Sequence, residues 1–64
     1  MTELKDKIKA LVDESGETVY AIAKETKISQ TAIAMYIKGD YKPKLENLQK
    51  LAEHFNVPLS YFIE

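Results

Sequence analysis

Apolar residues recur at three- and four-residue intervals in several short segments of this chain, and each segment is followed by a turn signal. The first segment has four apolar residues with the spacing of one helical face: Leu4, Ile8, Leu11 and Val12. Ser15-Gly16 is expected to end this helix, because glycine readily takes the left-handed conformation found at helix C-termini. No alternation of apolar and polar residues is long enough to predict a strand. The pattern therefore predicts an all-α fold.

Hydroxyl residues mark the starts of the first three predicted helices. Thr2 is expected to cap the first helix, with Glu3 in its first turn. Thr18 and Ser29 have the same capping role for the second and third helices. These two helices are short, and only a tight turn separates them.

The second and third helices are predicted over residues 18–26 and 29–37, and Gly39-Asp40 ends the latter. Ile28 precedes the Ser29 cap and Ile33 follows four residues after it, which is the spacing of a hydrophobic staple. Such a staple fixes the angle at which the chain enters a helix.

Two further helices are predicted after a polar stretch at 40–44. The apolar face of the fourth comprises Leu45, Leu48, Leu51, Ala52 and Phe55. Asn56 is a candidate left-handed cap, and Pro58 suits the first position of a last short helix that carries Leu59, Phe62 and Ile63. The expected architecture is a compact five-helix domain that covers residues 1–64.

The chain offers little besides helix packing to stabilise it. It has 64 residues, no cysteine and one histidine, so we expect neither a disulfide nor a metal site, and no cofactor. A catalytic nucleophile, base and orienting group are not evident either, since His54 and the serines fit surface, turn or capping roles, so we do not expect an enzyme. The absence of a membrane-length apolar run or a secretory signal leads us to expect a cytoplasmic protein.

Charge is distributed unevenly along the chain. The net charge is −1, but residues 18–44 hold five lysines against two acids, whereas both flanking segments are acidic. Positive charge therefore coincides with the pair of short helices. By themselves these lysines fit either an ordinary solvated surface or an anionic partner for that region.

The helix pair meets the physical needs of a helix-turn-helix unit. Ala23 supplies the small residue where the two helices cross, and four isoleucines can lock the pair to the core: Ile22, Ile28, Ile33 and Ile37. The outer face of the second helix of the pair then carries Gln30, Thr31, Ala34 and Met35.

The stretch from Ile22 to Ile33, followed by Gly39, resembles the helix-turn-helix of the lambdoid phage Cro and repressor family. Residues 43–52 and 55–63 are similar to the fourth and fifth helices of the same family, so the resemblance covers nearly the whole chain. It implies a lambda repressor-like (XRE-type) fold and a transcriptional repressor that places residues 29–37 in the major groove of double-stranded DNA.

The chain departs from the family pattern in four respects. Lys27 replaces the usual glycine of the turn, Val19 replaces a phosphate-binding glutamine, and Ile37 replaces an acidic residue. There is no arginine, which removes the strongest bidentate contact to guanine. These changes affect the expected phosphate contacts more than the expected fold.

The resemblance implies base contacts from Gln30, Thr31, Ala34 and Met35. Gln30 is the strongest candidate, because an amide can pair with N6 and N7 of adenine. Phosphate contacts are expected from the lysines, from the helix N-termini and from polar groups nearby: Thr18, Lys27, Ser29, Tyr36, Lys38, Lys42, Lys44 and Asn47. For Tyr36 the alternative is packing in the core.

Two features of the expected function concern partners. Family members usually bind pseudo-palindromic operators as two-fold dimers, and the resemblance assigns the interface to Leu59, Tyr61 and Phe62. We therefore expect a weak homodimer that forms mainly on DNA.

The alternative function is a protein-interaction module, such as an antirepressor or an antitoxin-like partner, that keeps the fold without binding DNA. The negative net charge and the missing arginine favour this alternative, whereas the clustered lysines favour DNA.

Overall fold

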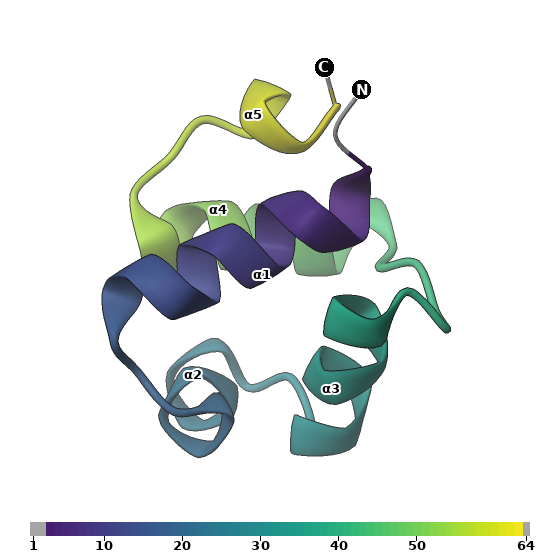
Figure 1. Ribbon diagram of the computed structural model, residues 1–64. Coiled ribbons are helices and arrows are strands. Elements are labelled where there is room, and N and C mark those ends of the chain that lie inside the picture. The colour runs from purple at the N-terminus through teal and green to yellow at the C-terminus, as the bar shows by residue number, and fades with distance from the viewer. Residues whose placement is uncertain (1–2, 64) are drawn as a thin grey trace.

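A computed structural model describes residues 3–63 of the chain. Over this range the chain forms five helices and no strand: α1 (Leu4–Ser15), α2 (Val19–Thr26), α3 (Gln30–Lys38), α4 (Leu45–Phe55) and α5 (Ser60–Ile63) (Figure 1). The predicted all-α, five-helix architecture is confirmed. Among the described residues, none of the helices has the length and apolar character needed to span a membrane.

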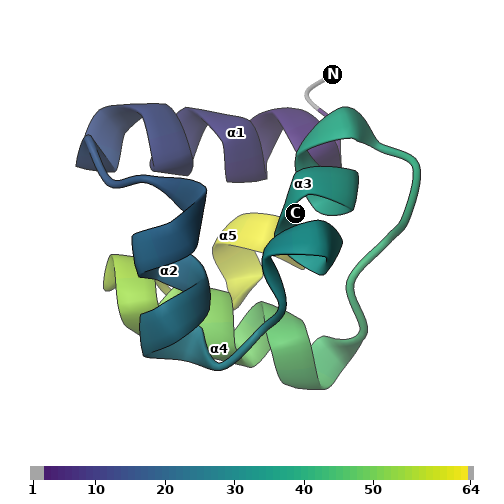
Figure 2. The ribbon, with the colours of Figure 1, turned by 90° about the horizontal axis from the view of Figure 1, so that it is seen from below.

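The helices enclose one core. In Figure 1, α5 lies on the upper side of α1, whereas α2 and α3 lie below it, and Figure 2 shows α2 and α3 between α1 and α4. Helix α1 packs against α3 and α5, and α2 packs against α3 and α4. The largest fully buried side chains come one from each of the first four helices: Ile8, Ile22, Ile33 and Leu51. Burial of these branched side chains supplies the main force that holds the helices together.

The predicted caps of α2 and α3 are confirmed. Thr18 Oγ1 accepts a hydrogen bond from the Ala21 N–H, and Ser29 Oγ accepts one from the Ala32 N–H, each over 3.1 Å. The start of α1 differs from the prediction, because Glu3 occupies the N-cap position and makes no side-chain capping bond. Thr2, the predicted cap of α1, lies outside the described residues.

Four helices end on a residue in the left-handed conformation. Gly16 and Asn56 have φ of 71° and 58°, as predicted for α1 and α4, and Lys27 and Gly39 have φ of 61° and 86° after α2 and α3. A Cβ at Gly39 would lie 2.6 Å from Cδ of Lys5, so the lysine side chain would have to move, but the φ of 86° is what favours glycine there.

The prediction that Pro58 opens the last helix is wrong by two residues. Helix α5 begins at Ser60, and the carbonyl of Pro58 accepts the Tyr61 N–H over 3.0 Å in the turn that precedes it. The fixed φ of proline suits this turn as well as it suits a first helical position, so the residue type alone could not distinguish the two.

Candidate nucleic-acid interface

The turn between α2 and α3 is held by a buried threonine. Thr26 is 7% exposed, and its hydroxyl donates to the Ile22 carbonyl over 2.7 Å and accepts the Ile28 N–H over 3.3 Å. These bonds tie the last turn of α2 to the segment that leads into α3. The sequence pattern predicts only that this helix ends at residue 26. The burial of Thr26 depends on tertiary packing, which helical spacing does not show.

The isoleucines fix the helix pair to the core largely as predicted. Ile22, Ile28 and Ile33 are buried, while Ala23 and Ile37 are half-buried and pack against the core. The buried face of α3 differs from the prediction in one respect. Tyr36, rather than Ile37, is the second fully packed residue of that helix, since it is 3% exposed.

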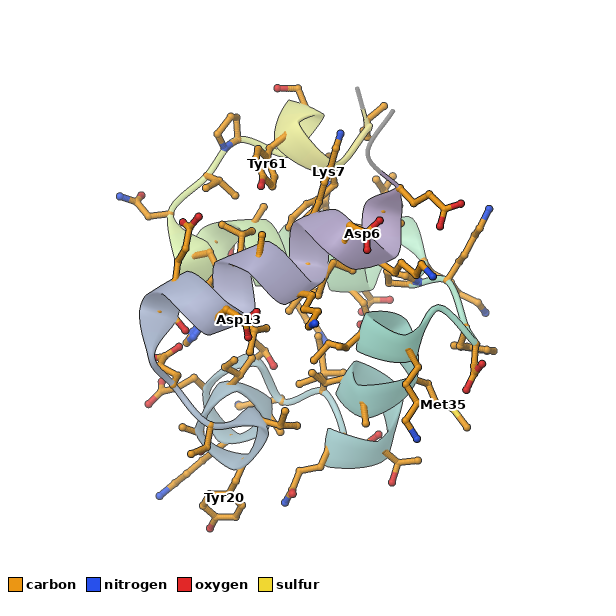
Figure 3. All side chains as sticks on the ribbon, in the orientation of Figure 1. Asp6, Lys7, Asp13, Tyr20, Met35 and Tyr61 are labelled. Atoms are coloured by element: carbon orange, nitrogen blue, oxygen red, sulfur yellow. The ribbon has the colours of Figure 1, made fainter. Side chains whose placement is uncertain are left out.

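The opposite face of α3 is open to solvent. Gln30 and Thr31 are exposed, Met35 is 41% exposed, and Ala34 is half-buried. Figure 3 shows Met35 pointing outward from α3, away from α1 and α2. The four predicted base-contacting residues therefore share one accessible helix face whose groups are short or flexible.

Exposed lysines precede and follow α3 in the chain. Lys27 precedes α3, Lys38 is its last residue, and Lys42 and Lys44 follow in the loop to α4, all four of them exposed. In Figure 1 the loop after α3 and the start of α4 lie on the same side of the molecule as α3. Thr18 and Ser29 are also exposed, and each hydroxyl oxygen already accepts a backbone hydrogen bond at a helix start. Their hydroxyl protons remain available to an anionic acceptor.

Tyr36 and Asn47 form a pair that joins α3 to α4. The Asn47 side-chain amide donates to the Tyr36 hydroxyl over 2.8 Å. The ring of Tyr41 stacks on that of Tyr36, with centroids 6.2 Å apart and planes inclined by 10°. Tyr36 thus differs from the other predicted phosphate contacts, because its ring belongs to the core.

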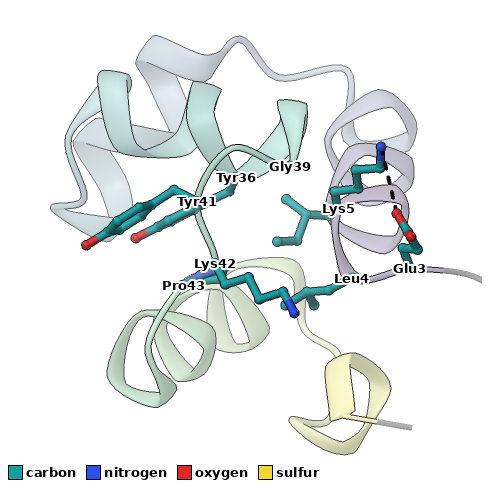
Figure 4. A pocket seen from close by; sticks show the side chains of 9 residues that line it. Glu3, Leu4, Lys5, Tyr36, Gly39, Tyr41, Lys42 and Pro43 are labelled. Atoms are coloured by element: carbon teal, nitrogen blue, oxygen red, sulfur yellow. Dashed lines mark ion pairs between the residues drawn. The ribbon is translucent and has the colours of Figure 1, made fainter.

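An open hollow of about 420 Å³ lies between the start of α1 and the loop after α3. Figure 4 shows Tyr36 and Tyr41 on one side of it and Glu3 and Lys5 on the other. Glu3 and Lys5 form an exposed ion pair of 3.7 Å.

The residues predicted to form a dimer interface differ in their exposure. Leu59 and Tyr61 are half-buried, Phe62 is 5% exposed and belongs to the core, and Ile63 is 65% exposed. Lys7 Nζ donates to the Tyr61 carbonyl over 3.0 Å and lies 5.8 Å from the centre of its ring, which ties α5 to α1. Part of the apolar surface of residues 59–63 therefore packs within the same chain and is not available to a second copy.

Two features were missed by sequence reasoning. Tyr20, on α2, is 62% exposed, and Figure 3 places it at the lower edge of the molecule, apart from Met35. His54 Nε2 lies 2.6 Å from Glu17 Oε2, so that the end of α4 is joined to the segment between α1 and α2. The separation of 37 positions between these partners explains why no local pattern indicates the contact.

The fold and this surface define a compact helical domain built around a helix-turn-helix, in which one face of the second helix is exposed and exposed lysines lie on either side of that face along the chain. The sequence model of the helix-turn-helix family matches residues 8–62, and the chain belongs to this family of DNA-binding transcription regulators, of the lambda repressor-like type. No curated protein matches the chain in sequence.

Proposed function

We propose that the chain binds a specific double-stranded DNA operator and represses transcription in the manner of a Cro protein, with α3 in the major groove. The observation that carries this proposal is the exposed face of α3 bordered by exposed lysines, in a chain whose net charge is −1. The positive charge is concentrated where a phosphate backbone would lie on either side of an inserted helix.

Four side chains on the exposed face of α3 would contact the bases and so recognise the DNA sequence: Gln30, Thr31, Ala34 and Met35. Gln30 is exposed at the first position of α3, where its amide can donate to and accept from one adenine edge. Ala34 and Met35 present apolar groups that can pack against thymine methyls. The chain has no arginine, so a bidentate guanidinium contact to guanine plays no part.

Phosphates would be bound by groups on both sides of α3. We assign this role to Thr18, Lys27, Ser29, Lys38, Lys42, Lys44 and Asn47, and to the hydroxyl of Tyr36. Each lysine that neutralises a phosphate releases condensed counterions, which makes binding depend steeply on salt. The buried ring of Tyr36 limits that residue to a contact through its oxygen.

A homodimer on two half-sites would use the α5 region. Leu59 and Tyr61 are partly accessible there, and Ile63 adds an exposed apolar side chain. Phe62 would support the interface from beneath, because its ring is already packed in the core. The small apolar area left for a second copy supports a weak dimer that forms on DNA.

The proposal is tested by selecting bound duplexes from a random DNA pool, followed by band-shift titrations at two salt concentrations. A DNA-binding repressor yields an enriched pseudo-palindromic sequence and loses affinity steeply as salt rises. Failure to shift any duplex in dilute salt would contradict DNA binding. It would favour an antirepressor- or antitoxin-like interaction module, for which exposed Tyr20 and Met35 offer apolar contacts.

A further inference from the structure

The hydrogen bond between Tyr36 and Asn47 links the helix that would read bases to the segment that would hold phosphate. Tyr36 is on α3, and Asn47 is the third residue of α4, 11 residues further along the chain. Apart from this bond, α3 packs mainly on α1 and α2. The shared core sets the distance between α3 and α4, and this hydrogen bond fixes the side chain of Asn47 relative to α3.

The ring of Tyr36 also orders the loop between these helices. The Tyr41 ring, which is 54% exposed, lies nearly parallel to it, and Figure 4 shows the two phenol oxygens at the same end of the stack. Pro43 is buried in the same loop, between exposed Lys42 and Lys44. The stack and the buried proline hold the backbone that carries both lysines.

The hydrogen bond fixes the Asn47 amide but leaves donors available. An asparagine amide has two N–H donors, and a tyrosine hydroxyl that accepts one of them keeps its own proton. The paired groups thus still offer one amide N–H and one O–H to an anionic oxygen. A group that is already oriented loses less conformational entropy when it binds.

We propose that Tyr36 is a positioning residue, which makes α3, the 40–44 loop and Asn47 one rigid unit that binds DNA bases and phosphates together. The proposal rests on the proposed DNA-binding function and deepens it, because it assigns to a core side chain a role in affinity. Its hydroxyl orients the Asn47 amide, and the two groups bind phosphate as one pair, so that loss of either group removes the contribution of both. Its ring acts through Tyr41.

The test is a double-mutant cycle of Tyr36→Phe and Asn47→Ala, measured by fluorescence anisotropy on the selected duplex. Tyr36→Phe keeps the ring and removes the hydroxyl. We expect each single variant to weaken binding by roughly threefold to tenfold, the range of one hydrogen bond, and the double variant to bind no more weakly than the weaker single variant. His54→Gln is the control, since it alters a side-chain contact at the other end of α4 and is expected to leave the affinity within about twofold.

Two further measurements distinguish loss of Asn47 positioning from a general loss of fold stability. The side-chain amide resonances of Asn47 in the free protein are expected to shift in Tyr36→Phe and to remain unchanged in His54→Gln. Affinities are compared at a temperature at which circular dichroism shows every variant folded. Wild-type affinity in folded Tyr36→Phe, or multiplicative losses in the double variant, would overturn the inference. Failure of the unaltered chain to bind any duplex would instead overturn the proposed function.

Discussion

The backbone N–H of Lys27 donates to the carbonyl of Ala23 over 2.8 Å, and Lys27 adopts a φ of 61° in making this bond. The left-handed conformation costs about 1 kcal/mol or more for a residue with a Cβ, and glycine avoids this cost. The helix-turn-helix of this chain therefore contains local backbone strain at a residue that we also assign to phosphate binding.

We predict that Lys27→Gly stabilises the fold by about 1 kcal/mol and weakens DNA binding at the same time. Urea unfolding and band-shift titrations measure the two effects separately. Asn56→Gly is the matched control, because Asn56 has a similar φ of 58° but asparagine tolerates that region. Its gain in stability is expected to be smaller, and an equal gain would show that backbone strain at Lys27 is not the cause.

Gln30→Ala is expected to reduce affinity by about 1–3 kcal/mol for the selected operator and to relax the preference at one base position. The reason is the loss of an amide that can both donate to and accept from a base edge. Repeating the random-pool selection with the variant identifies the position. Gln49→Ala removes the same group from an exposed position on α4 and is expected to leave the selected sequence unchanged. Equal losses on every duplex would remove Gln30 from the base-reading residues.

Lys42→Ala is expected to weaken binding to all duplexes alike and to reduce the slope of log K against log salt by about 1. The exposed lysine would no longer displace a counterion from the DNA. Lys9→Ala, on the exposed surface of α1, removes the same charge and serves as the control with a smaller change in slope. A slope that stays the same in Lys42→Ala rules out a direct phosphate contact.

Ile33→Ala is expected to destabilise the fold by about 2–5 kcal/mol, and Ile33→Val by about 0.5–1.5 kcal/mol. Ile33 is fully buried, and small domains have little stability to lose, so the alanine variant should be partly unfolded in water. Urea unfolding of dilute protein provides the measurement. Ile63→Ala, at a site 65% exposed, is the control, with an expected change within about 0.5 kcal/mol. Similar losses at both sites would contradict the assignment of Ile33 to the core.

Most of the fold could be predicted because the local signals agree with the tertiary structure. Thr18 and Ser29 cap α2 and α3, and Gly16 and Asn56 take the left-handed conformation, all as expected from residue type. Such features depend on only a few neighbouring residues. The misplaced start of α5 at Pro58 is a boundary error between a turn and a helix, two structures that share the same φ.

The candidate interface could be predicted only in part, because burial of a short helix depends on what packs against it. Helical spacing separated Met35 from the core, but it did not establish that Tyr36 is buried. Nor could it reveal that Tyr36 accepts a bond from Asn47, because that contact joins two helices. The exposure of Tyr20 similarly follows from the placement of α2 and not from its own apolar pattern.

The most direct test of the central claim is a nuclear magnetic resonance titration of the isotope-labelled chain with the selected duplex. If α3 enters the major groove, the largest amide shifts will fall at Lys27, along residues 30–38 and between Lys42 and Asn47, while exposed positions of α1 such as Lys9 and Asp13 change little. Shifts confined to α1 and the last turn of α4, or no shifts in dilute salt, would contradict the account.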